Sequence, residues 1–191
     1  SVTPATYTVL VNPTAAPVAS NNGPLCSGAT LTLTASTIAG ATYSWTGPNG
    51  YTSNQQNPSI PGATTGESGT YSVVANVSGC NSSSPGTTTV VINPIPTITA
   101  GSNSPLCEGA TLNLTASTFL GASYSWTGPN GFTSNVQNPS ITGATTAASG
   151  TYSVVATASG CSSSAPATTD VVVSGTPATP VAGSNSPLCE G

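Results

Sequence analysis

An 81-residue repeat dominates the sequence. At this offset the segment 43–50, YSWTGPNG, meets an identical segment at 124–131, and 68–75, SGTYSVVA, meets its copy at 149–156. No gap is needed between these matches. The repeat predicts two complete modules, residues 14–94 and 95–175, in a tandem array whose units contact mainly their neighbours.

The ends of the chain fall inside the same repeat. Residues 1–13 match 82–94, and the residues from 180 onward match the opening of a module. We therefore expect 1–13 to be the C-terminal strand of a preceding module and 176–191 to be the start of a following one. The chain is expected to be an interior piece of a longer array.

The amino-acid composition lacks the side chains that most enzymes and nucleic-acid-binding proteins use. The chain has no Lys, Arg or His, only four acids, and a formal net charge of −4. It has no histidine base, lysine Schiff base or arginine clamp, and nothing that neutralises phosphates. We expect no enzyme activity, no cofactor and no nucleic-acid partner. The longest apolar runs fall far short of the ~20 residues of a membrane helix, so we expect no membrane insertion.

The acids do not suggest a metal or catalytic site. They are scattered along the sequence, and no acid occurs at the same position in both complete modules: Glu67 aligns with Ala148, and Glu108 with Ser27. A carboxylate pair is therefore not a repeated feature, and no metal site is expected.

Within a module the pattern is that of β-strands. Residues 30–35, TLTLTA, alternate apolar and polar residues, as in a half-buried strand, and so do 70–77. Residues 41–45 and 87–92 are two further strands. The turn at 47–50 contains Asn49-Gly50, a pair that takes the positive φ angles of a tight hairpin. The expected fold class is all-β.

These residues resemble the immunoglobulin family. The segment 67–73, ESGTYSV, is similar to the Asp-x-Gly-x-Tyr-x-Cys signature of strand F, and Trp45 stands where the strand C tryptophan would be. The resemblance implies tandem immunoglobulin-like β-sandwich modules. Tyr71 would be the corner tyrosine, and Trp45, Tyr71 and their repeats Trp126 and Tyr152 would be structural core. The intersheet disulfide is expected to be missing, since Val73 occupies the strand F cysteine position.

A narrower resemblance concerns the whole module. The segments 24–34, 43–45, 69–73 and 78–80 are similar to the immunoglobulin-like repeats of large secreted surface proteins of gliding and related Bacteroidota. Members of that family are exported, often as adhesins or filament components. The resemblance implies an extracellular or cell-surface protein.

The implied topology bears on the five cysteines. Strands B and F run in the same direction, so Cys26, before B, and Cys80, after F, would lie at opposite ends of a module. A strand of about eight residues spans roughly 26 Å, whereas a disulfide needs Cα atoms within about 7 Å. The preferred pairing is therefore Cys26 with Cys161 of the next module, with Cys80, Cys107 and Cys189 bonded to neighbouring modules. Pairing within modules, Cys26–Cys80 and Cys107–Cys161, and free thiols remain alternatives.

Three functions fit these features. The first is a stiff stalk or fibre segment, since the linkers at 12–17, 93–96 and 176–180 are short and proline-rich. Its partners would be neighbouring modules of the same chain, with lateral self-association favoured by the low charge. The second is a glycan- or surface-binding array that uses the aromatic residues Tyr51 and Phe132. The third is a spacer in a secreted hydrolase.

Overall fold

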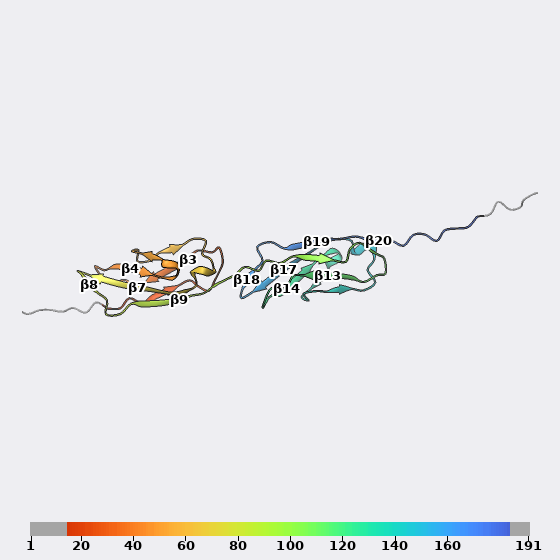
Figure 1. Ribbon diagram of the computed structural model, residues 1–191. Coiled ribbons are helices and arrows are strands. Elements are labelled where there is room, and N and C mark those ends of the chain that lie inside the picture. The colour runs from red at the N-terminus through yellow and green to blue at the C-terminus, as the bar shows by residue number, and fades with distance from the viewer. Residues whose placement is uncertain (1–14, 184–191) are drawn as a thin grey trace, which may run out of the picture. The chain divides into compact units, whose positions relative to one another are not determined.

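The computed structural model describes residues 15–183. The predicted strand at 1–13 and the predicted partner role of Cys189 lie outside the described residues. The chain forms two compact units, one made of 1–95 and 159–161 and the other of 96–158 and 162–191, and each is described by itself (Figure 1).

Within residues 15–95, the first unit contains ten short strands and two 3-10 turns. Its elements are β1 (Ala19–Asn21), β2 (Leu25–Cys26), β3 (Leu31–Ala35), β4 (Thr42–Thr46), η1 (Pro48–Gly50), β5 (Thr52–Ser53), β6 (Ser59–Ile60), η2 (Thr65–Glu67), β7 (Gly69–Val77), β8 (Cys80–Asn81), β9 (Gly86–Val90) and β10 (Ile92–Asn93).

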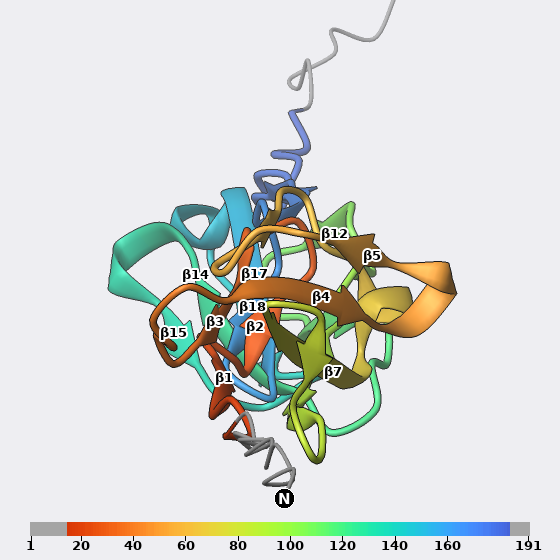
Figure 2. The ribbon, with the colours of Figure 1, turned by 90° about the vertical axis from the view of Figure 1, so that its left-hand side faces the viewer.

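These strands form two layers. One sheet is ordered β5-β4-β7-β8, with β9 also paired to β7, and the other is ordered β1-β3-β6. Figure 2 shows β5, β4 and β7 side by side. A short parallel pair, β2 with β10, joins Leu25 to Ile92 and Cys26 to Asn93 in register. The prediction of an all-β fold is confirmed.

The core lies between the two layers. Alternate residues of β3 and β7 point inward, so Leu31, Leu33, Tyr71 and Val73 are fully buried, while the residues between them stay partly accessible. Trp45 from β4 fills the centre of this cluster and is also fully buried. Burial of this apolar surface, at about 25 cal/mol per Å², is the main force that holds such a small sandwich together.

The second repeat, residues 95–175, has the same pattern 81 residues later, and its residues 159–161 belong to the first unit. Its elements are β11 (Ala100–Ser102), β12 (Leu106–Cys107), β13 (Leu112–Ala116), β14 (Ser123–Thr127), η3 (Pro129–Gly131), β15 (Thr133–Ser134), β16 (Ser140–Ile141), η4 (Thr146–Ala148), β17 (Gly150–Ala158), β18 (Cys161–Ser162), β19 (Ala167–Val171) and β20 (Val173–Ser174). Its sheets have the same order, β15-β14-β17-β18 with β19 on β17, and β11-β13-β16, and β12 pairs with β20.

Two predicted features differ from the structure. The strand expected at 87–92 is broken at Val91, because its first part pairs with β7 and its second part with β2. The turn at 47–50 has the expected positive φ angles, 53° at Asn49 and 73° at Gly50. It is nevertheless longer than a tight hairpin, since Pro48 starts a 3-10 turn and the loop closes through a hydrogen bond from Gly47 N to Tyr51 O.

Candidate functional site

A tight hairpin presents Cys161. The strand β17 turns into β18 through Ser159 and Gly160, whose φ angles are 50° and 79°. Two consecutive positive φ angles are the mark of a type I′ turn, which matches the twist of the flanking strands. The equivalent turn of the first repeat, Ser78-Gly79, has φ angles of 51° and 87° and places Cys80 in the same way. Each Ser-Gly-Cys segment thus sets a cysteine directly after a rigid turn.

Cys26 is placed by the parallel strand pair. Leu25 N donates to Val91 O at 3.0 Å, and Ser27 N donates to Asn93 O at 2.9 Å. These hydrogen bonds flank Cys26, which lies opposite Asn93 in register. Cys26 is therefore held on regular backbone beside the last strand of its own repeat.

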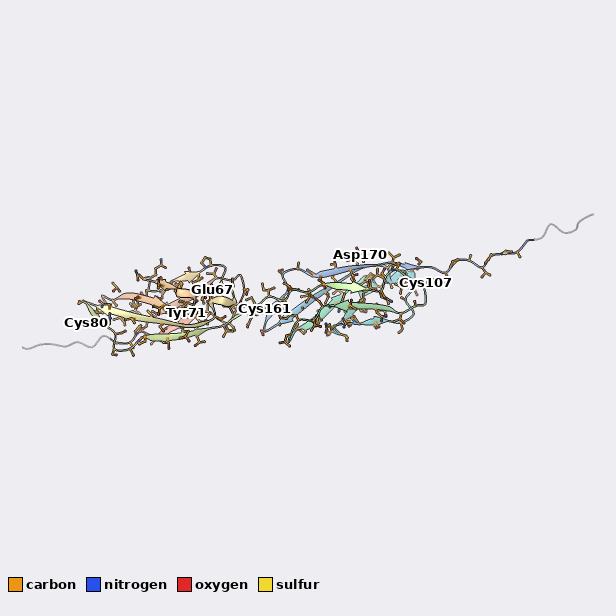
Figure 3. All side chains as sticks on the ribbon, viewed as in Figure 1. Glu67, Tyr71, Cys80, Cys107, Cys161 and Asp170 are labelled. Carbon is orange, nitrogen blue, oxygen red and sulfur yellow. A yellow bond between two sulfur atoms is a disulfide. The ribbon has the colours of Figure 1, made fainter. Side chains whose placement is uncertain are left out.

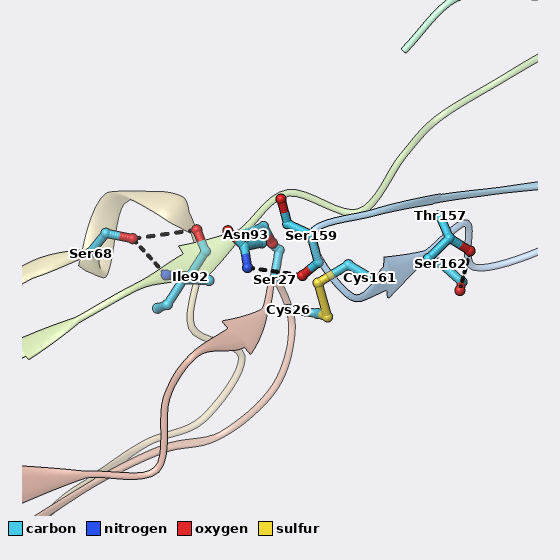
Figure 4. Close-up of a disulfide and its surroundings, with 9 residues drawn as sticks. All are labelled: Cys26, Ser27, Ser68, Ile92, Asn93, Thr157, Ser159, Cys161 and Ser162. Atoms are coloured by element: carbon cyan, nitrogen blue, oxygen red, sulfur yellow. Dashed lines mark hydrogen bonds between the residues drawn. A yellow bond between two sulfur atoms is a disulfide. The ribbon is translucent and has the colours of Figure 1, made fainter. Parts of the chain in front are cut away.

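These two cysteines form a disulfide. Their Cα atoms are 5.7 Å apart and 135 residues apart in sequence, a Cα separation typical of disulfides. A second interaction accompanies it, since Asn93 Nδ2 donates to Ser159 O at 3.2 Å (Figure 4). Cys161 is only 2% exposed. This is the inter-module pair that the sequence favoured over Cys26–Cys80. A stable disulfide fits an oxidising, extracytoplasmic setting.

Cys80 is the counterpart of Cys161 in the first repeat, and Cys107 is the counterpart of Cys26 in the second. Both are exposed (Figure 3). Cys107 lies opposite Ser174 in the β12–β20 pair, and Glu108 N donates to Ser174 O at 2.8 Å. This is the same backbone arrangement that holds Cys26. Within residues 15–183, Cys107 forms no disulfide.

The two tryptophans and the two corner tyrosines are buried. Trp45 Nε1 donates to Gln56 O, and Trp126 Nε1 donates to Gln137 O. The corner tyrosines reach back four residues: Tyr71 OH donates to Glu67 O, and Tyr152 OH donates to Ala148 O, both at 3.0 Å. These contacts satisfy the polar ends of the rings, so the side chains hold the two layers of each repeat together.

Burial raises the pKa of both corner tyrosines. The effect of burial is the larger one at Tyr71, where the negative charge of Glu67 adds to it, and burial is the cause at Tyr152. The phenols therefore remain neutral hydrogen-bond donors well into alkaline pH.

Tyr51 and Phe132, the predicted surface contacts, are half-buried. Each packs edge-to-face against the corner tyrosine of its own repeat, with ring centroids 5.5 Å apart for Tyr51–Tyr71 and 5.4 Å for Phe132–Tyr152. Such aromatic pairs add about 0.5–1.5 kcal/mol to the effect of burial. Both rings thus contribute to packing, and only part of each surface is open to a ligand.

A capping box closes the loop next to Tyr51. The Glu67 carboxylate accepts hydrogen bonds from Thr64 N at 2.7 Å and from the Thr64 hydroxyl at 2.6 Å, and Gly66 N donates to Thr64 Oγ1. The hydrogen bond from the Thr64 hydroxyl, followed by that from its backbone N–H, lowers the pKa of Glu67. This box was not among the predicted features, although Thr64-x-x-Glu67 has the known capping-box pattern.

The second repeat has a cavity near the equivalent loop. Ala148 replaces Glu67, and a cavity of about 320 Å³ is lined by Phe132, Ala148, Tyr152 and neighbouring loop residues. Thr145, the counterpart of Thr64, makes no side-chain cap hydrogen bond. The cavity is thus lined by both apolar side chains and polar loop residues, Thr145 among them.

Among the described residues, no cluster of His, Cys, Asp or Glu has the composition of a metal site. Asp170 accepts a hydrogen bond from the Thr151 hydroxyl at 2.6 Å, across the β17–β19 pair. In residues 15–183 no helix is long and apolar enough to cross a bilayer.

Comparison with known proteins informs the fold alone. No family model matches the chain, and no curated protein matches its sequence. Solved structures do match. A chain from the crystal structure of the mouse coronavirus receptor-binding domain complexed with its murine receptor covers 82% of this chain and 99% of its own length, at 11% identity and a TM-score of 0.51.

A titin I-band fragment is also similar. It covers 84% of this chain and 66% of its own length, with 13% identity and a TM-score of 0.53. At such identities the likeness concerns architecture. Together with the two-layer topology and the tyrosine corners, it shows that both repeats adopt the immunoglobulin-like β-sandwich fold.

Proposed function

We propose that this chain is a structural segment of an extracellular bacterial fibre or adhesin stalk, built from immunoglobulin-like modules that disulfides join in series. The observation that carries the proposal is the bond between Cys26 of one repeat and Cys161 of the next. A bond within each module would stabilise that module alone. A bond from one repeat to the next also restricts the movement of the modules relative to each other.

The same cysteine placement in both repeats supports further disulfides between successive modules along the chain. Cys107 has the backbone placement of Cys26, and Cys80 follows the same type of turn as Cys161. On this proposal, Cys107 and Cys189 bond to hairpins of following modules and Cys80 to a preceding one. The resemblance to repeats of gliding-type Bacteroidota surface proteins, an expectation from the sequence alone, would place the protein at the cell surface. The modules of one chain would be the main partners.

Lateral association of chains is a further part of the proposal. The outward faces of β7 and β9 are lined by small hydroxyl side chains such as Thr70, Thr87 and Thr89. With a net charge of −4 on 191 residues, repulsion between neighbouring chains is weak. These faces would allow chains to pack side by side in a fibre.

The test uses a chain of four repeats, imaged as single particles by electron microscopy after oxidation. We expect a narrow distribution of end-to-end distances that broadens on reduction. A variant in which every cysteine equivalent to Cys26 is serine should show the broad distribution without a reductant. Equal flexibility of all samples would overturn the role of the disulfides in stiffness.

A binding function is the second candidate, favoured by the cavity beside Phe132. Its rims of aromatic and hydroxyl groups suit a sugar ring better than a charged ligand. The test is a glycan-array measurement on the 191-residue chain, with Phe132→Ala and Tyr51→Ala variants. Saturable binding that disappears in Phe132→Ala and persists in Tyr51→Ala would favour this function. Absence of binding would leave the structural function or a spacer role in a secreted hydrolase. The full-length gene separates these two, because the spacer role requires a catalytic domain elsewhere in the protein.

A further inference from the structure

We infer that the Cys26–Cys161 disulfide acts as a covalent bypass for tension, so that a pulling force passes each repeat along its edge and leaves the cores unloaded. This inference rests on the proposed stalk function and specifies how the stalk carries load. It depends on covalent connectivity and on the strand pairing within each unit.

The connectivity decides which residues carry force. When the two ends of the chain are pulled apart, the force reaches Cys26 and crosses to Cys161 through two sulfur atoms. The alternative path is a backbone loop of 135 residues, which stays slack. This loop contains β3–β10 of the first unit and β11–β17 of the second. Trp45, Trp126 and both corner tyrosines are therefore outside the loaded path.

The loaded segments are edge strands. In the first unit they are β1 and β2, from residue 15 to Cys26. In the second repeat they are β18, β19 and β20, from Cys161 to Ser174. A strand pulled along its own axis is already extended, so it gains little length before its backbone is taut. Neither segment needs to leave its sheet in order to transmit the load.

Without the bond, the force takes a weaker path. It enters the first unit through β1, passes along β2 and leaves the unit at β10. The strands β2 and β10 are parallel and joined by only two residue pairs. Pulling the entry of β2 and the exit of β10 in opposite directions shears this pair. The hydrogen bonds Leu25 N–Val91 O and Ser27 N–Asn93 O would be among the first to break. The core behind them would then be exposed to the full load.

The second repeat offers a place for the next bypass. Cys107 lies on β12, whose partner β20 belongs to the loaded segment. A bond from Cys107 to the hairpin of a following repeat would open an overlapping path 81 residues later. Every core of a long array would then lie within at least one slack loop, and reduction would convert a nearly inextensible rod into an extensible chain.

The experiment is single-molecule force spectroscopy on the 191-residue chain, tethered at both ends through enzymatic tags without cysteine. Part of the same oxidised, monomeric preparation is mapped for its disulfides. We expect oxidised molecules to show no core unfolding at forces that fully unfold reduced ones. At full stretch they should be shorter by the length of the loop, 135 residues at about 3.6 Å each, or roughly 490 Å in all.

Two variants serve as matched controls. Cys26→Ser should behave like the reduced chain even without a reductant. Cys107→Ser should keep the shorter fully stretched length of the oxidised chain. Core unfolding of mapped Cys26–Cys161 molecules at the same force as Cys26→Ser would overturn the bypass. If mapping instead finds Cys26–Cys80, the disulfide arrangement of the proposed function fails, which is a separate outcome from failure of the load path.

Discussion

The two repeats share the same core but differ at their cysteine-bearing hairpins. Trp45 and Trp126 are fully buried, and both corner tyrosines make the same hydrogen bond at the same distance. The hairpins also have the same turn, yet Cys161 is buried whereas Cys80 is exposed. The local sequence around the two cysteines therefore does not set their burial. Cys161 is bonded to Cys26 of the first repeat, and this bond accompanies its burial.

The largest expected effect comes from breaking that disulfide. Removing a bond that closes a loop of this size is expected to cost about 2–5 kcal/mol. We predict that Cys26→Ser and Cys161→Ser each lower the free energy of unfolding by this amount in urea titrations without a reductant. Cys107→Ser, at the equivalent position of the other repeat, should change it by less than about 0.5 kcal/mol. Equal losses for Cys26→Ser and Cys107→Ser would contradict the asymmetry between repeats.

A second difference concerns packing between the layers. Gly86 lies so close to Pro17 that an added Cβ would overlap the backbone carbonyl of Pro17. The second repeat has Ala167 at this position, and it packs against the core. Because backbone must move to make room, Gly86→Ala should cost about 1–3 kcal/mol in thermal or urea unfolding. The reverse change, Ala167→Gly, should cost about 1 kcal/mol or less. A Gly86→Ala variant as stable as the parent would show that Pro17 moves freely.

The tyrosine corners should respond alike. Tyr71→Phe and Tyr152→Phe each remove one hydroxyl that donates to a backbone carbonyl at 3.0 Å. We expect each to lower stability by about 0.5–1.5 kcal/mol. The check is urea unfolding of the two single variants and the double variant. A loss confined to one repeat would show that the two corners are not equivalent, despite their identical geometry.

The smallest effect concerns the capping box that only the first repeat possesses. Because folding lowers the pKa of Glu67, its contribution is present above the unfolded pKa, about 4.3, and disappears as the pH falls through the folded value. Glu67→Ala should therefore lower the Tm at pH 7, on the order of a degree or two, and leave it unchanged near pH 2.

Ala148→Glu is the reverse substitution, made at the equivalent position of the second repeat. It would place a carboxylate near Thr145 in the second repeat, and we expect a small rise in Tm at pH 7 that disappears in acid. Differential scanning calorimetry at the two pH values measures both changes. A shift of the same size at pH 2 would show that packing, and not the carboxylate, is responsible.

Much of the fold could be predicted from the sequence because the core positions follow a strict pattern. The alternation in 30–35 and 70–77 places Leu31, Leu33, Tyr71 and Val73 inside. The two-residue strands could not be predicted in this way. Segments such as β2 and β6 are too short to show a period, and only their partners in space define them.

The site was partly predictable for a similar reason. Strand direction in the immunoglobulin topology was enough to favour Cys26–Cys161 over pairing within modules. Asn93, which holds the hairpin turn through Ser159 O, gave no signal, since a polar residue before a proline is common in linkers. The cavity beside Phe132 also escaped prediction, because its lining comes from the separate segments 129–132, 141–148 and residue 152, which meet only in the folded chain.

The most direct test of the central claim, that a disulfide joins consecutive repeats, is non-reducing peptide mapping of the monomeric chain by mass spectrometry. Pepsin at low pH is suitable, because the chain has no Lys or Arg for trypsin and because acid suppresses thiol exchange. We predict a linked peptide pair that contains Cys26 and Cys161 and that separates on reduction. A pair that contains Cys26 and Cys80 would contradict the account.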